Sequence, residues 1–183
     1  MKKNTSFSLQ WALLFMLVIL GFAARILPHA PNFAPIGAIA IFSGIYLPRR
    51  LAVILPLATM LLSDAIIGFY SWQIMISVYA SFTLASLIGL FVRKHKQLGT
   101  MLAGTLLGSL LFFTITNFAV WLFGTMYPHT IAGLMQSYFM ALPFFRNTLL
   151  GDLFYIGVLA GSYECITYWV KKKRLILQTK KAL

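Results

Sequence analysis

The sequence predicts an all-α integral membrane protein with six transmembrane helices and with both termini in the cytoplasm. Hydrophobic residues make up 60% of its 183 residues and charged residues only 10%, against about 25% charged residues in soluble domains. Several apolar runs approach the roughly 20 residues that cross a bilayer. The apolar composition continues almost to the C-terminus, so we expect one domain over residues 1–183.

The apolar runs are the predicted spans, at approximately 8–27, 33–47, 51–70, 73–92, 100–124 and 148–170. The first run resembles a signal peptide, but it has no convincing small-residue cleavage site, so we expect it to be retained as a helix. The second run has only about 15 residues, which also suits a re-entrant segment.

The basic residues decide whether the second run crosses. If all six runs cross and the N-terminus is cytoplasmic, 13 of the 15 Lys and Arg residues lie inside. If the second run does not cross, Arg49 and Arg50 move outside and the later clusters change side with them. Six crossings are therefore predicted. Clusters of this kind beside apolar runs face anionic lipid headgroups, so the net charge of +12 predicts a lipid bilayer and no nucleic acid as partner.

The stretch 131–145 is a further apolar candidate, but a span there would place the basic cluster at 171–174 outside. We expect this stretch to form a short amphipathic helix on the outer surface, with Thr130 as its N-cap. Pro143 should break it, so that the sixth span begins near Arg146.

Polar residues in or near the spans map to the outer side. Asp64 lies in the outer half of the third run and needs a partner or a polar cavity, because a charge near mid-bilayer costs at least about 2.5–3.5 kcal/mol. Arg25 and Arg146 have the right depth to pair with it. Such pairs can simply hold helices together, and that alternative stays open beside an outward-facing pocket. The candidate substrate-binding residues are Arg25, His29, Asn32, Asp64, Asn117, Arg146, Asn147 and Asp152.

Spacing and proline content add local detail to this side. On a helix, Thr148 and Asp152 share a face, as do Asn147 and Gly151. The three prolines of "ILPHAPNFAP" stiffen the connection after the first run and can hold His29 over a pocket mouth at low entropic cost.

Catalytic signatures are absent from the sequence. It contains no HExxH, GxSxG, Walker A or Gly-rich dinucleotide motif, so we expect no enzyme activity, catalytic residue, metal or cofactor. The single cysteine, Cys165, excludes an internal disulfide and a multi-cysteine metal site. A structural or assembly subunit of a membrane complex is the alternative function. A metal-assisted enzyme using His29, His129 and Asp64 is a weaker one.

The stretches "RILPHAPNFAPIGAIAIFSG", "LLSDAIIGF" and "LPFFRNTLLGDLFYIGVLAG" resemble an uncharacterised family of small bacterial inner-membrane proteins, over roughly residues 20–162. That family is similar to the substrate-binding S components of energy-coupling factor (ECF) vitamin transporters. The resemblance implies an S-component-like fold, a vitamin pocket under the loop between the first two helices, and docking on a coupling subunit driven by ATPases.

Solitary S components that handle cobalamin are distantly similar as well. The matching positions are His29, Asp64 and Arg146, whereas the cobalt-binding cysteine of that group has no counterpart here. The sequence therefore predicts a substrate-binding membrane subunit for uptake of a vitamin or cofactor precursor.

Overall fold

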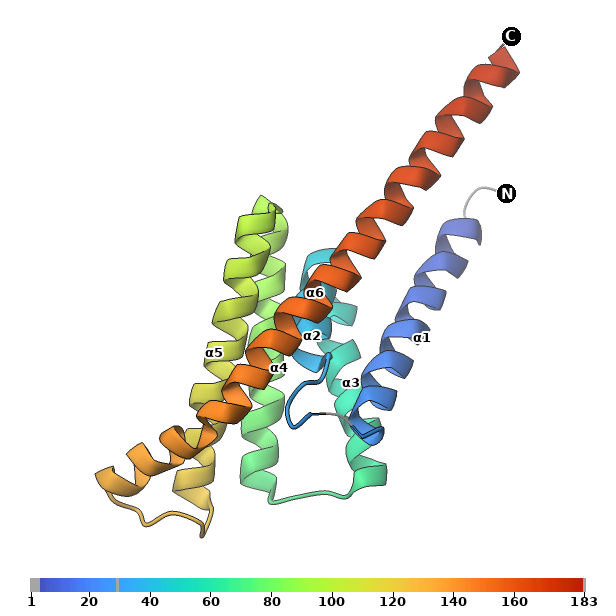
Figure 1. Cartoon of the computed structure of the whole chain (residues 1–183). Coiled ribbons are helices and arrows are strands. Elements are labelled where there is room, and N and C mark those ends of the chain that lie inside the picture. The colour runs from blue at the N-terminus through green and yellow to red at the C-terminus, as the bar shows by residue number, and fades with distance from the viewer. Residues whose placement is uncertain (1–3, 29, 183) are drawn as a thin grey trace.

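The structure, a computed structural model, describes residues 4–28 and 30–182, most of which are helical and none of which lies in a strand. The α-helices shown in Figure 1 are α1 (Asn4–Ile26), α2 (Ile36–Tyr46), α3 (Arg49–Ile67), α4 (Trp72–Val92), α5 (Leu98–Phe123) and α6 (Ile131–Ala182). A 3-10 turn, η1 (Arg93–His95), joins α4 to α5. By length and composition, α3, α4, α5 and α6 can each cross a membrane. The predicted class, a helical membrane protein, is confirmed.

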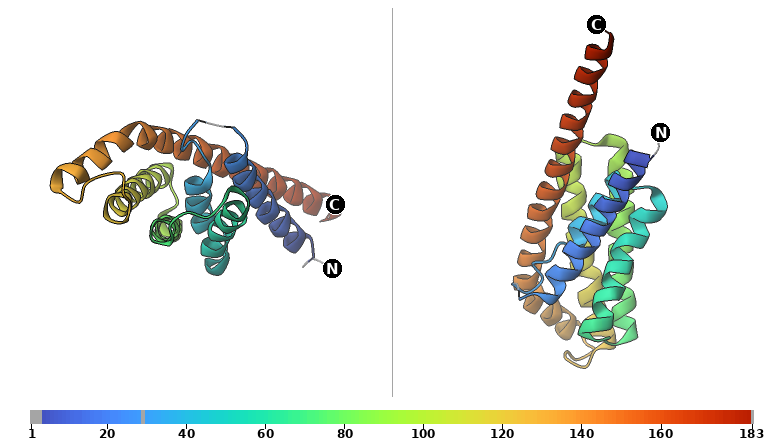
Figure 2. Two further views of the ribbon diagram at one scale, coloured as in Figure 1. Left: turned by 90° about the horizontal axis from the view of Figure 1, so that it is seen from below. Right: turned by 90° about the vertical axis from the view of Figure 1, so that its right-hand side faces the viewer.

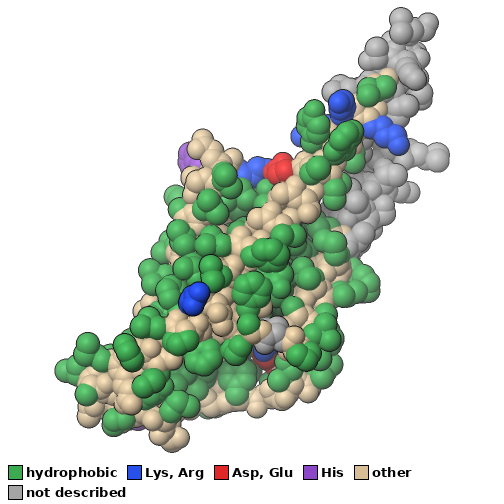
Figure 3. All heavy atoms as spheres, in the orientation of Figure 1, with side chains coloured by type: hydrophobic (Ala, Val, Ile, Leu, Met, Phe, Trp, Pro, Cys, Tyr) green, Lys and Arg blue, Asp and Glu red, His purple; other side chains and the backbone are tan. Residues whose placement is uncertain are grey.

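Successive helices run in opposite directions along the bundle. Both ends of the chain therefore point the same way, and the connections α2–α3 and α4–α5 lie at that end too (Figure 1). Figure 3 shows a mostly hydrophobic face, with most of its charged side chains gathered toward this end. The basic residues at 49–50 open α3 directly after the first of these connections, and those at 93–96 lie in the second. These are the helix directions that six alternating spans require.

The short helix α2 occupies the centre of the bundle. Its 11 residues rise only about 16 Å, against a hydrocarbon thickness of about 30 Å. Nine of these residues are buried, and α2 contacts each of the other five α-helices. The helix is apolar on every face, as a fully enclosed helix must be. It is shorter than the predicted run 33–47, because Pro31 and Pro35 keep the preceding segment out of the helical conformation.

The helices α2 and α4 pack with their backbones in close contact at Gly44 and Gly89. A Cβ atom on either glycine would collide with the backbone of the other helix. On a neighbouring face of α2, a Cβ on Gly108 of α5 would lie 3.3 Å from Ile41. Small residues therefore bring α2 close enough to its neighbours to exclude solvent and lipid.

The C-terminal end of α2 is capped by a side chain from another element. Arg93, in η1, donates from Nε to the carbonyl oxygen of Gly44 at 2.9 Å, and its Nη2 donates to the carbonyls of Gly44 and Leu47. These are carbonyls that a helix leaves without an intrahelical partner. The guanidinium also places positive charge at the negative end of the helix dipole.

The third and sixth predicted spans differ from the helices observed. α3 ends at Ile67 instead of residue 70, because Gly68 adopts a φ of 111°, a conformation that favours glycine and ends helices. The helix that contains the sixth predicted span is longer than that span, since α6 runs from Ile131 to Ala182. Its C-terminal part extends past the other helices (Figure 1).

The prediction of a separate surface helix at 131–145 is wrong, because the helix continues through Pro143 as part of α6. The predicted N-cap is confirmed: the Thr130 hydroxyl accepts from the Gly133 amide at 3.1 Å. α6 bends in its N-terminal, orange part (Figure 2), as expected where proline removes one backbone hydrogen bond.

Contacts with α5 explain why the helix is not broken there. Ser137 donates to the carbonyl of Asn117 at 3.1 Å, and Tyr138 donates to the carbonyl of Thr114 at 2.9 Å. The ring of Phe113 packs against Phe145, with centroids 4.6 Å apart. These contacts hold α6 on both sides of its proline, so the cost of the lost hydrogen bond is offset by tertiary packing.

The cap on α2 gives a first prediction. Replacing Arg93 with Met should lower the free energy of unfolding by about 2–3 kcal/mol, because two buried carbonyl groups lose a charged donor. Thermal and denaturant unfolding of the purified protein in detergent would measure the loss. Lys94→Met is the matched control, since Lys94 is exposed and should change stability by less than about 0.5 kcal/mol. Equal stability of the two variants would contradict the capping role.

Candidate functional site

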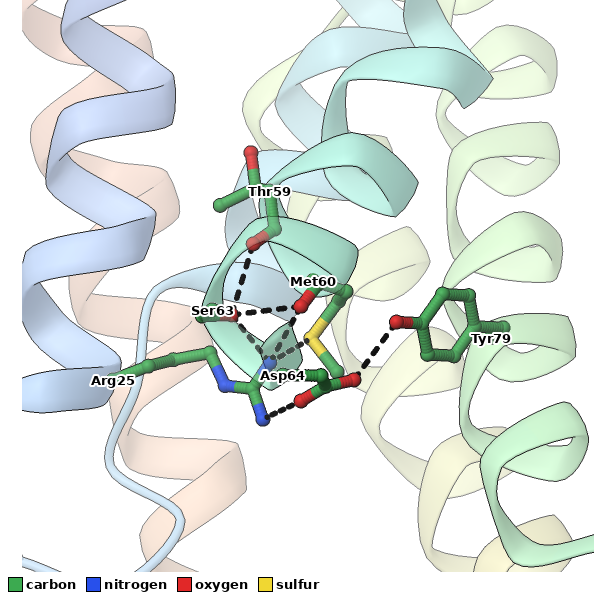
Figure 4. A network of polar contacts seen from close by, with 6 residues as sticks. All are labelled: Arg25, Thr59, Met60, Ser63, Asp64 and Tyr79. Carbon is green, nitrogen blue, oxygen red and sulfur yellow. Dashed lines mark hydrogen bonds and ion pairs between the residues drawn. The ribbon is translucent and has the colours of Figure 1, made fainter. Parts of the chain in front are cut away.

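Arg25 and Asp64 form a buried ion pair between the end of α1 and α3 (Figure 4). Nη2 of Arg25 lies 2.7 Å from Oδ1 of Asp64, whose side chain is 1% exposed. Nη1 of Arg25 donates to the Ser63 hydroxyl at 2.6 Å and contacts Met60. The second carboxylate oxygen of Asp64 accepts a 2.8 Å hydrogen bond from Tyr79 of α4. Three helices are thus joined through one carboxylate.

This network identifies the partner that Asp64 requires. Of the two arginines at the right depth, Arg25 makes the pair. Arg146 is exposed on α6 and makes no ion pair within the described part of the chain. Both members of the pair have further partners, Ser63 for Arg25 and Tyr79 for Asp64, and these contacts offset part of the cost of burying the two charges.

Asp152 of α6 lies at the N-terminal end of α2. Its side chain is only 4% exposed, and Ser109 of α5 donates to its Oδ2 at 2.7 Å. The backbone amide of Ala38 also hydrogen-bonds to this carboxylate. A Cβ atom on Gly37 would overlap the carboxyl group, so glycine is needed for this close approach. The carboxylate of Asp152 thus caps the N-terminal end of α2.

A cavity of about 420 Å³ opens beside the first turns of α2. Its volume falls within the range of about 300–1,000 Å³ that is usual for small-molecule sites. Apolar side chains form much of the wall, among them Ile41, Val78, Phe82 and Phe112. The polar side chains that line it are Arg25, Asn32, Tyr70, Thr105, Ser109, Thr148 and Asp152. An apolar wall with a few convergent polar groups is typical of a ligand site.

The connection between α1 and α2 is attached to α6 beside this cavity. Asn147 donates from Nδ2 to the carbonyl of Pro31 at 2.9 Å. One turn later along α6, a Cβ on Gly151 would lie 3.4 Å from Phe33. Asn32, between these contacts, has a φ of 60°, which asparagine tolerates better than most residues. The predicted face shared by Asn147 and Gly151 is therefore directed toward this connection.

The structure brings together some of the predicted substrate-binding residues and separates others. Arg25, Asn32 and Asp152 line the cavity, and so does Thr148, on the same face as Asp152. Asp64 pairs with Arg25 and does not itself line the cavity. Asn147 holds the connection that follows α1.

The remaining predicted positions lie elsewhere. Asn117 donates to the carbonyl of Phe113 in its own helix at 2.7 Å and lines a separate recess of about 100 Å³, together with Asn32. Arg146 lines neither space. His29 lies outside the described residues.

Four residues at the site were not found by reasoning from the sequence: Gly37, Tyr70, Tyr79 and Ser109. Gly37 had a usable signal, since it follows the proline-rich stretch and opens an apolar helix. The positions of Tyr70, Tyr79 and Ser109 at the site depend on how the helices pack against one another, which the sequence does not show. Tyr70, between α3 and α4, lines the cavity. Partial burial and the nearby carboxylate of Asp64 raise the pKa of Tyr70 to about 12, although Arg25 acts in the opposite direction. The phenol therefore remains a hydrogen-bond donor at neutral pH.

The metal site considered from the sequence has no support among the residues described. His129 lies in the α5–α6 connection, where its ring is 6.0 Å from that of Trp121 and its Nε2 is 3.4 Å from the carbonyl of Gly124. Asp64 has other partners, Arg25 and Tyr79. No group of three His, Cys, Asp or Glu side chains with metal-binding geometry occurs in the described part of the chain.

The fold and the cavity define a helical membrane protein with a ligand-sized space inside its helix bundle. A family model described as a family of unknown function (DUF6580) matches residues 5–175, and the chain belongs to this family. No curated protein and no solved structure matches the chain.

The buried ion pair gives a second prediction. Arg25→Met should destabilise the protein by about 3–5 kcal/mol, because it leaves a buried carboxylate without its cation. The double variant Arg25→Met/Asp64→Asn should lose less than the sum of the two single variants. Unfolding in detergent would measure this coupling.

Arg146→Met is the matched control for that cycle. This arginine is exposed and unpaired among the described residues, so its loss should cost less than about 0.5 kcal/mol. Additive effects of the two single substitutions would show that Arg25 and Asp64 do not depend on each other.

Proposed function

We propose that the protein is a substrate-binding membrane subunit for the uptake of a small vitamin or cofactor precursor. The observation that carries the proposal is the cavity of about 420 Å³ beside the start of α2. Its apolar wall and its few polar side chains are suited to orienting a small molecule. Binding without chemistry is proposed because no catalytic motif accompanies the cavity.

The cavity volume favours a compact ligand over a molecule of the size of cobalamin. The connection between α1 and α2, held to α6 by Asn147, is the segment that a ligand would have to pass or displace. The similarity to S components supports the further proposal that uptake is powered by a coupling subunit with ATPases, in a bacterial inner membrane. In this proposal the protein crosses the membrane six times, with both termini in the cytoplasm.

A structural or assembly subunit is the second candidate function. The ion pair between Arg25 and Asp64 favours it, since both charges already have partners within the chain. The two candidates differ in one respect: only the first requires a small molecule in the cavity.

The binding function gives a third prediction. The protein purified in mild detergent should retain a small molecule, which native mass spectrometry would detect. Val78→Phe should abolish the retention, because Val78 lines the cavity and the larger ring would fill it. Ile76→Phe adds similar volume on the exposed face of the same helix, where Ile76 is 56% exposed, and should retain the molecule.

The same experiment separates the two candidate functions. Consistent absence of any retained molecule, with Val78→Phe instead losing a co-purifying protein, would favour the assembly role.

The proposed orientation gives a fourth prediction. A fluorescent protein fused to the C-terminus should fold and emit light, because it stays in the cytoplasm. Alkaline phosphatase inserted in the α3–α4 connection, residues 68–71, should be active, because that side is periplasmic in the proposed topology. If alkaline phosphatase fused to the C-terminus in place of the fluorescent protein is active, the number of crossings is odd or the orientation is reversed.

A further inference from the structure

Two charged residues that line the cavity, Arg25 and Asp152, differ in whether they have a partner of opposite charge. Among the described residues, Arg25 is the one cation that lines it, and this arginine is engaged by Asp64 and Ser63. The other carboxylate oxygen of Asp64 accepts a hydrogen bond from Tyr79. That pair is therefore neutral as a unit. Asp152 also lines the cavity, and no cationic side chain pairs with it in the described part of the chain.

The partners of Asp152 compensate only part of its charge. An ionised carboxylate offers about four acceptor positions, of which the Ser109 hydroxyl and the Ala38 amide occupy two. The N-terminus of α2 supplies the equivalent of roughly half a positive charge. In the ionised state, part of the charge of Asp152 therefore has no partner within the described part of the chain, at a site that is 4% exposed. A buried acid of this kind is neutral when it is protonated, or is paired when a cation enters the same space.

The apolar part of the cavity wall is also suited to a cation with an apolar body. Phe82 of α4 and Phe112 of α5 both line the cavity, with ring centroids 5.1 Å apart. Aromatic faces attract organic cations as well as apolar groups. An anionic ligand would lie in the same space as Asp152 without a free counter-charge, because Arg25 is already neutralised.

We propose that the cavity binds a compact organic cation, with its charged nitrogen at Asp152 and its apolar part against the rings of Phe82 and Phe112. This inference rests on the proposed binding function and specifies the class of its ligand. Ser109 positions the carboxylate through its hydrogen bond. Thr148, one turn before Asp152 on the cavity face of α6, offers a hydroxyl to a polar group of the ligand.

The test uses three probes with one skeleton and different charge: 3-(2-naphthyl)propan-1-amine, the corresponding alcohol and the corresponding carboxylic acid. Calorimetric titration of the purified full-length protein in nanodiscs at pH 7 measures their affinities. The amine should bind at least about tenfold more tightly than the alcohol, and the acid should bind more weakly than both. In Asp152→Asn the difference between amine and alcohol should fall below about twofold.

Two further variants keep the test decisive. Glu164→Gln removes an acid that pairs with Lys96 at 2.5 Å, away from the cavity, and should leave the preference for the amine intact. Ser109→Ala keeps the carboxylate and should preserve the sign of the preference even if Asp152→Asn does not fold. Equal or tighter binding of the alcohol or the acid by the wild-type protein would overturn the proposal, and so would an unchanged preference in Asp152→Asn.

The outcomes also distinguish this inference from the function on which it rests. If the purified protein retains a neutral or anionic molecule while the amine shows no preference, the ligand class is wrong and the binding function stands. If nothing is retained and no probe binds, both are wrong.

Discussion

The structure depends on how a short helix is enclosed inside a bundle of longer ones. α2 begins and ends within the protein, so the polar groups at its two ends cannot rely on bulk water. Arg93 donates to carbonyls at its C-terminal end, and the carboxylate of Asp152 accepts from an amide at its N-terminal end. Each charge has the sign that the helix dipole favours, and each comes from a different neighbouring element.

The cavity is the other consequence of this short helix. Beyond the N-terminal end of α2, the bundle contains residues 30–35 of the preceding connection and the space lined by Asp152. Non-helical backbone is tolerated inside a membrane protein where it is buried or lines a polar space. One side chain therefore serves two purposes: Asp152 satisfies the end of α2, and it places a carboxyl group in the wall of the cavity.

Much of the architecture could be predicted because bilayer physics acts on composition. Long apolar runs and their basic flanks gave the helices and their directions, and the i to i+4 spacing placed Thr148 with Asp152 and Asn147 with Gly151. Pro143 was misjudged because its cost depends on neighbours: packing of α6 on α5 at Phe145 and Ser137 keeps the helix continuous. The end of α3 was missed because a positive φ at Gly68 is a backbone choice that composition does not reveal.

By itself, the sequence determined that the chain is a helical membrane protein, because long apolar runs are stable in lipid and the cost of burying charge there restricts where charged residues can lie. Only the tertiary structure decided which charges meet. Arg25 and Arg146 were equal candidates as partners of Asp64, and the sequence did not reveal that Asp152 meets Ser109 and the start of α2. Side-chain partners across helices depend on rotation and depth of each helix, which follow from packing around α2 and not from local sequence.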